Sequence, residues 1–141
     1  MMIIIYSKVH TGYYEELLCS AKNMVPTENL KVCTSIHELS GEICRPGIRN
    51  AIVILLASDQ NDYDNILSLR DLLWGVRIIL IMHSSNPDII LQGHLLNPRF
   101  LSACDSSYRE AVSVLQRMIN KASTGNPIRK RSPVKKSSME I

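Results

Sequence analysis

A short apolar run in the middle of the chain, residues 51–57, constrains the fold more than any other stretch. Its seven consecutive apolar residues end abruptly in Ser58 and Asp59. A run of this length, with β-branched residues and a polar turn at its end, is typical of a strand buried on both faces. Such strands lie in the middle of parallel sheets that helices cover on both sides. Residues just after it are therefore expected at the carboxyl edge of the sheet, where open α/β folds place their sites.

Strand-like and helix-like segments alternate along the rest of the chain. Apolar runs predict further strands at residues 2–6, 30–34, 76–82 and 100–104. Helical periodicity, together with cap and stop residues, predicts the intervening helices. They are expected at residues 13–24, between Ser35 and Pro46, at residues 64–74, between Asn86 and Asn97, and at residues 108–122.

This alternation predicts a (βα)₅ domain, a parallel five-stranded sheet with helices on both faces. The strands at 30–34 and 100–104 are shorter and more mixed than the other three, which indicates that they lie at the two edges. The predicted strand order is 2-1-3-4-5, the three-layer, doubly wound arrangement of flavodoxin-like folds. We expect this domain over residues 1–122 and a basic, disordered tail over residues 123–141, where helical periodicity stops.

Composition favours a soluble protein. The chain is 45% hydrophobic and 21% charged, and no apolar run is long enough to span a membrane. Its first residues lack the basic segment and cleavage site of a signal peptide, so we expect a cytoplasmic location and no membrane partner. Four cysteines show no zinc-ligand spacing and are expected to be reduced and mostly buried. They are Cys19, Cys33, Cys44 and Cys104.

The net charge of +3 conceals an asymmetry. Residues 121–141 hold six basic residues against Glu140, a net charge of +5, so the preceding residues carry −2. Such a tail could contact the phosphates of nucleic acid. Because it has no aromatic residue to stack on bases, we favour a solubilising extension and keep nucleic-acid association as an alternative.

Polar residues follow each predicted strand, where a site would draw on them. They are Ser7, Lys8, Ser58, Asp59, His83, Ser84 and Asp105. The loop after the first strand has neither the glycine pattern of a dinucleotide site nor that of a P-loop. The histidines lack the spacing of metal ligands. We expect no cofactor and no metal, with a small-ligand or nucleotide-binding domain, or an enzyme using this edge, as the alternative.

Two of these strands also carry a family resemblance. Residues 51–57, Ala-Ile-Val-Ile-Leu-Leu-Ala, and residues 76–82, Val-Arg-Ile-Ile-Leu-Ile-Met, are similar to the central and fourth strands of the receiver domain of two-component response regulators. The layout of residues 1–122 resembles the same family. This resemblance implies a flavodoxin-like fold and a place in signal transduction. In that family the central strand ends in an aspartate that accepts a phosphoryl group.

The chain departs from the family at the positions that carry this chemistry. Ala57 stands where the family has its phosphoacceptor, and Asp59 follows two residues later. Phosphoryl transfer needs a carboxylate nucleophile and a metal ion. The resemblance therefore implies a pseudo-receiver, which is not an enzyme and acts by binding a protein. The residues in place of the magnesium-binding acidic pair, the hydroxyl residue of the fourth strand and the Lys-Pro pair are Tyr6-Ser7-Lys8, Met82 and Ala103-Cys104.

The resemblance also implies where a partner would bind. Receivers commonly use the face formed by the fourth helix, the fifth strand and the fifth helix. Here the fourth helix is richer in apolar residues than one buried face requires. We expect a homodimer or a contact with another protein on this face. The candidate residues are Ile89, Ile90, Leu95, Tyr108, Val112 and Leu115.

Overall fold

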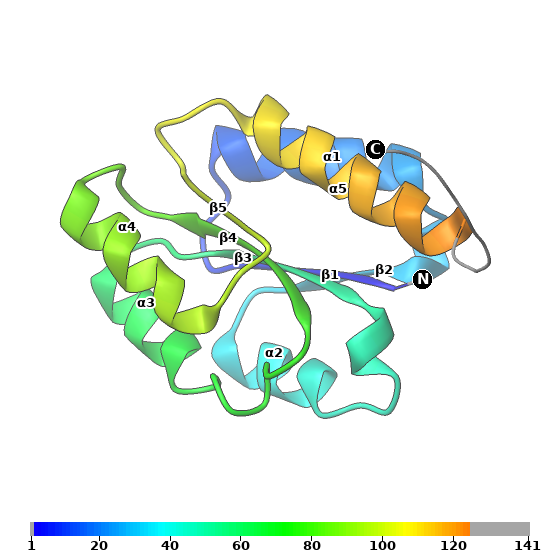
Figure 1. Ribbon diagram of the computed structural model, residues 1–141, viewed down its shortest axis with the longest axis horizontal. Helices are drawn as coiled ribbons and strands as arrows, with labels where there is room; N and C mark the ends of the chain where they lie inside the picture. Colours follow the sequence, from blue (N-terminus) through cyan, green and yellow to red (C-terminus); the bar gives the residue numbers. More distant parts are fainter. Residues whose placement is uncertain (1, 125–141) are drawn as a thin grey trace, which may run out of the picture.

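The predicted sheet is present in the computed structural model, which describes residues 2–124 (Figure 1). Every strand pair in it is parallel, and the order is β2-β1-β3-β4-β5. The predicted α/β class and the flavodoxin-like order 2-1-3-4-5 are therefore confirmed. The strands are β1 (Ile3–Ser7), β2 (Leu30–Cys33), β3 (Ile52–Leu56), β4 (Arg77–Met82) and β5 (Phe100–Ala103).

Helices cover both faces of this sheet, with α1 and α5 on one side and α2, α3 and α4 on the other (Figure 1). The α-helices are α1 (Gly12–Met24), α2 (Ile36–Ile43), α3 (Gln60–Leu67), α4 (Pro87–Gly93) and α5 (Tyr108–Thr124). Short 3₁₀ helices are η1 (Thr27–Asn29), η2 (Ile48–Asn50) and η3 (His94–Leu96). In residues 2–124, none of these helices has the length and hydropathy needed to cross a membrane.

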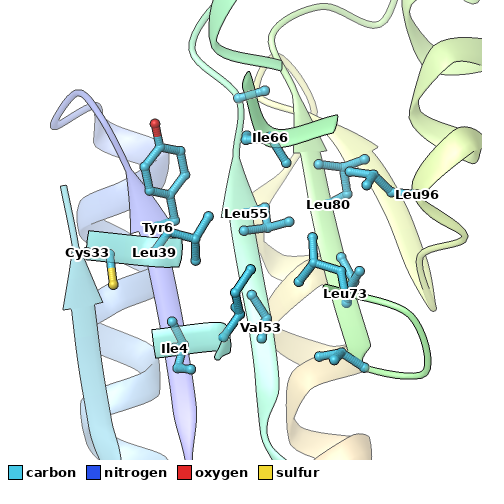
Figure 2. Close-up of a cluster of buried hydrophobic side chains, with 14 of the residues drawn as sticks. Ile4, Tyr6, Cys33, Leu39, Val53, Leu55, Ile66, Leu73, Leu80 and Leu96 are labelled. Carbon is cyan, nitrogen blue, oxygen red and sulfur yellow. The ribbon is translucent and has the colours of Figure 1, made fainter. Parts of the chain in front are cut away.

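The core has two halves, one on each face of the sheet. Successive residues of a strand point to opposite faces. Val53 and Leu55 of β3 therefore pack beneath α2 and α3, while Ile52 and Ile54 pack beneath α1 and α5. Figure 2 shows the first half, with Tyr6 and Leu55 among its buried side chains. All of β3 is buried, as a central strand requires.

The third helix differs most from its prediction. The sequence predicts a helix over residues 64–74, but α3 begins at Gln60 and ends at Leu67. Asp59 sets the early start, because its carboxylate accepts a hydrogen bond from the Asp62 backbone at 2.7 Å. After α3, residues 68–75 form a series of turns that ends at Gly75, whose φ is +79°. In this segment Leu69 and Leu73 pack on the core, whereas Leu72 and Trp74 are exposed, so the predicted helix is wrong there.

Cysteine burial is a second correction. All four cysteines are free, but only Cys33 is buried, so the expectation of mostly buried thiols is wrong. Cys19 lies on the solvent side of α1, and Cys44 and Cys104 lie just beyond the ends of α2 and β5. The fifth helix continues past the predicted boundary at residue 122 as far as Thr124. The rest of the predicted tail, residues 125–141, lies outside the described residues.

Candidate functional site at the carboxyl edge of the sheet

Ala57 directly follows the central strand, at the position where the receiver resemblance would place a reactive carboxylate. β3 ends at Leu56, and the next residue, Ala57, is only 4% exposed. The Ala57 backbone N–H donates to the Ile81 carbonyl at 2.9 Å, so its position beside β4 is fixed by the sheet. On the other side, Ser7 of β1 is in register with Leu56. A methyl group therefore stands at the centre of this edge.

The buried carboxylate at this edge is that of Asp62, which is 1% exposed. Its Oδ1 accepts a hydrogen bond from the Tyr6 hydroxyl at 2.5 Å. Its Oδ2 accepts from the Ser58 backbone N–H at 2.9 Å and from the Ser58 hydroxyl at 3.0 Å. Both oxygens are thus engaged, as burial of a carboxylate requires. This network ties β1 to the start of α3, and Figure 2 shows the Tyr6 hydroxyl at the end of the cluster away from Ile4.

Asp62 belongs to a capping arrangement that is present in both α2 and α3. In α2, Ser35 is the N-cap and Glu38, three residues on, accepts from both the backbone N–H and the hydroxyl of Thr34 at 2.9 Å. In α3, Asp59 is the N-cap and Asp62 accepts from the same two groups of Ser58. The paired carboxylates are a variant of the capping box in which the acid reaches the residue before the N-cap. Asp59 and Asp62 therefore hold the start of α3.

Burial changes the proton affinity of Tyr6. Its side chain is fully buried, and this burial raises the pKa of the phenol above its ordinary value of 10.0. The hydrogen bond to Asp62 and the charges of Asp62 and Asp59 raise this pKa further. The phenol therefore stays protonated at neutral pH and serves Asp62 as a donor. A phenol with a raised pKa is poorly suited to act as a general base near neutral pH.

A small hollow lies beside the ends of β1, β3 and β4, next to the start of α1. It encloses about 60 Å³. Pockets that hold drug-sized ligands typically enclose about 300–1,000 Å³, so this one has room for water-sized groups only. Ser7, which lines it, is 1% exposed and donates its hydroxyl to the Val9 carbonyl at 2.5 Å. The lining residues are Ser7, Val9, Thr11, Leu56, Ala57, Ser58, Ile81 and Cys104.

The remaining predicted site residues form a separate group beyond β4 and β5. Asp105 Oδ2 accepts from the backbone N–H of Ser85 at 3.2 Å and from its hydroxyl at 2.9 Å. Ser84 Oγ accepts from the Asn86 backbone at 3.0 Å, next to the start of α4. Nδ1 of half-buried His83 is buried and has no hydrogen-bond partner among the described residues. These contacts order the loop between β4 and α4.

The predicted site is therefore divided. Ser7, Ala57 and Ser58 meet around the small hollow, whereas Lys8 is exposed and Asp59 is an exposed helix cap. Within residues 2–124, no three His, Cys, Asp or Glu side chains gather closely enough to hold a metal ion. The polar side chains at this edge form hydrogen bonds that stabilise the loops and the helix starts.

The predicted interface residues fall into two groups on opposite faces of the sheet. Ile89 and Ile90 are half-buried against the core beneath α4. Tyr108 and Val112 are half-buried against the core beneath α5. Leu115 is 0% exposed, so its assignment to a surface was wrong, because it points from α5 into the sheet. Leu95 is 52% exposed and is the candidate best placed to meet a partner.

Sequence reasoning missed two features. One is the pairing of Asp62 with Tyr6, which lie 56 positions apart. The spacing of Asp59 and Asp62 was a usable signal, since an acid three residues after an N-cap marks a helix start. The other is the exposure of Trp74, which is 71% and results from the turns that replace the predicted helix.

Comparison with known proteins adds a fold neighbour. The sequence matches no protein-family model and no curated protein. Its structure is similar to the crystal structure of a "putative pilus assembly-related protein" from Burkholderia pseudomallei, with a TM-score of 0.59 and 12% sequence identity. The similarity covers 87% of this chain and 89% of that one. At this level of identity the likeness supports a shared fold, the parallel five-stranded α/β sheet.

Proposed function

We propose that this chain is a receiver-like regulatory domain that works in the cytoplasm by binding another protein, without phosphoryl transfer. The observation that carries this proposal is the buried Ala57 at the end of β3. A methyl group cannot accept a phosphoryl group, and the two acids that follow it in the sequence, Asp59 and Asp62, are engaged in starting α3. The carboxyl edge is thus used for stability.

The surroundings of Ala57 support the same proposal. A phosphorylated carboxylate needs a divalent metal to neutralise its developing charge, and oxygen ligands must hold that metal. Tyr6 and Ser7 occupy the end of β1, and their hydroxyl groups donate hydrogen bonds to Asp62 and to the Val9 carbonyl. The hollow of about 60 Å³ beside Ala57 is also small for a nucleotide or a flavin.

The fold neighbour suggests a cellular setting. Its description relates that protein to pilus assembly. We propose that this chain regulates the assembly of a multiprotein complex through a protein contact. A complex reconstituted from the purified chain and a purified assembly component would support this setting. Binding of a small metabolite with no protein partner would contradict it.

Incubation with acetyl phosphate and magnesium tests the absence of phosphoryl transfer. The expected result is an unchanged intact mass, because no free carboxylate stands at the end of β3. A phosphorylatable receiver domain treated in parallel shows that the reagent is active. Asp59→Asn is the matched variant. A stable phosphoryl group on Asp59 that is absent from Asp59→Asn would overturn the proposal.

A further inference from the structure

A groove lies at the amino edge of the sheet, opposite to the edge described above. It has a volume of about 400 Å³ and runs between the turns before β4 and the segment from η3 to β5. Leu73, Val76 and Leu96 line it and are nearly buried, which gives it an apolar floor. Trp74 and Leu95 line it too and are 71% and 52% exposed. Large apolar side chains exposed around a concave surface are typical of an interaction site.

Basic side chains border this groove. Arg70 and Arg99 line it, and the Arg49 guanidinium lies against Gly75, another lining residue. We call Arg49, Arg70 and Arg99 the basic rim. Within residues 2–124, no guanidinium of the basic rim forms an ion pair with a carboxylate. Among the described residues, Asp71 is the one acidic residue that lines the groove, so this part of the groove and its rim is net positive.

Further basic residues lie next to the groove. Arg99 also lines a neighbouring hollow of about 280 Å³ with Arg77, Met118 and Lys121. Burial, followed by the charge of Arg99, lowers the pKa of the Arg77 guanidinium, as expected where cations are crowded. An approaching acidic group would be attracted to this edge and would relieve the repulsion among its cations.

We propose that this groove binds an acidic peptide segment of a partner protein, with one aromatic or aliphatic side chain inserted against Trp74 and Leu95. In such a complex the carboxylates of the segment pair with Arg70 and Arg99. The proposal rests on the proposed partner-binding function and adds the place and the chemistry of the contact. It also moves the contact from the α4, β5 and α5 face to the turns before β4.

Charge disfavours two other occupants. Residues 125–141 carry five basic residues against Glu140, so this segment has the same sign as the basic rim. In a two-fold dimer formed through the groove, each copy would present the same arginines to the other. Like charges placed opposite each other across an interface are costly. An acidic segment from another protein meets neither difficulty.

The first step of the test is selection of peptides from a random display library on the full-length chain. Enriched sequences are expected to combine Asp or Glu residues with an aromatic or aliphatic residue. Trp74 is the only tryptophan of the sequence, so binding of an enriched peptide should change the tryptophan fluorescence. Neutral or basic enriched sequences, or no enrichment, would overturn the proposal.

Groove variants provide the second step, with affinities measured by calorimetry. Trp74→Ala, and Arg70→Glu combined with Arg99→Glu, should each weaken binding by roughly tenfold or more, as loss of a central anchor or charge pair does. These side chains are exposed, so the variants should fold. Leu91→Ala and Arg117→Glu are matched controls at exposed positions outside the groove, and their affinities should stay within about twofold.

Three results would contradict the groove proposal. They are equal binding by the groove variants, competition by a synthetic peptide of residues 125–141, and a dimer in sedimentation equilibrium that Trp74→Ala dissociates. Each of these leaves the absence of phosphoryl transfer untouched. Conversely, a phosphoryl group on Asp59 would overturn the proposed function without bearing on peptide affinity, so the two failures are distinguishable.

Discussion

The hydroxyl groups of Tyr6 and Tyr13 are both buried, but they differ in their hydrogen bonding. The Tyr6 hydroxyl serves Asp62, whereas the buried Tyr13 hydroxyl has no partner among the described residues. Tyr6→Phe leaves Asp62 Oδ1 unpaired and should lower the free energy of unfolding by about 1.5–3 kcal/mol. Tyr13→Phe removes an unpaired buried group, so the free energy of unfolding should stay unchanged or rise by up to about 1 kcal/mol. Urea denaturation of both variants checks this, and equal losses would contradict it.

Buried tyrosines also make stability depend on alkaline pH. Burial raises the pKa of Tyr13 and of Tyr63 to about 12 from an ordinary 10.0. Because the folded-state pKa is the higher one, the protonated phenols favour folding. Their contribution is complete below about pH 10 and is lost as the pH rises towards about 12.

The free energy of unfolding should therefore fall as the pH rises above about 10. Urea denaturation in a series of alkaline buffers measures this fall, and Tyr13→Phe should reduce its slope. Phenolate absorbance gives an independent check. Titration of all the tyrosines of the folded protein near their ordinary pKa would contradict the prediction.

At the scale of an element, substitutions of Asp59 test whether this residue stabilises α3 as its N-cap. Asn caps a helix about as well as Asp, so Asp59→Asn should leave stability within about 0.5 kcal/mol. Asp59→Ala removes the acceptor for the Asp62 backbone N–H and should cost about 1 kcal/mol. Ser35→Ala in α2 is the matched comparison, because Ser35 makes the same contact with Glu38. Thermal and urea denaturation measure all three variants.

The turns between α3 and β4 depend on Gly75. Its φ of +79° is unfavourable for other residues, and an added Cβ would lie 2.3 Å from Arg49 Nη1. Gly47 has a similar φ of +85° with no neighbour within 4 Å of an added Cβ. Gly47→Ala should therefore cost about 1 kcal/mol through backbone strain alone, and Gly75→Ala should cost more. Equal losses in denaturation experiments would show that Arg49 moves away at no cost.

Local patterns predicted some elements well and others poorly for physical reasons. The cap residues Ser35 and Asn86 were predicted from their neighbours, because a cap contacts groups only two or three positions away. The end of α3 was not predicted. Apolar residues recur with helical spacing through Leu73 and Trp74, but Leu73 packs on the core whereas Trp74 is exposed on the turns that replace the helix.

For the whole molecule, strand order was predictable because burial on one or both faces is visible in composition. The five residues of β3 are all buried, whereas Leu30 and Val32 of the edge strand β2 are half-buried. The closure of the carboxyl edge was not predictable in the same way. It depends on the hydrogen bond between Tyr6 of β1 and Asp62 of α3. These two residues come close only because β1 and β3 are neighbours in the sheet.

The contact between Tyr6 and Asp62 has a consequence for folding kinetics. The Tyr6–Asp62 hydrogen bond closes a loop of 56 positions, so we expect it to form late, after β1 has paired with β3 and α3 has begun. Loss of a contact made late in folding mainly accelerates unfolding. Stopped-flow measurements on Tyr6→Phe should show unfolding faster by between roughly tenfold and 150-fold, the factors that correspond to a loss of about 1.5–3 kcal/mol, and a nearly unchanged refolding rate. Slower refolding would instead place the bond in the transition state. The buried carboxylate is thus expected to set the lifetime of the folded domain, and the local helix caps to help set the speed of its formation.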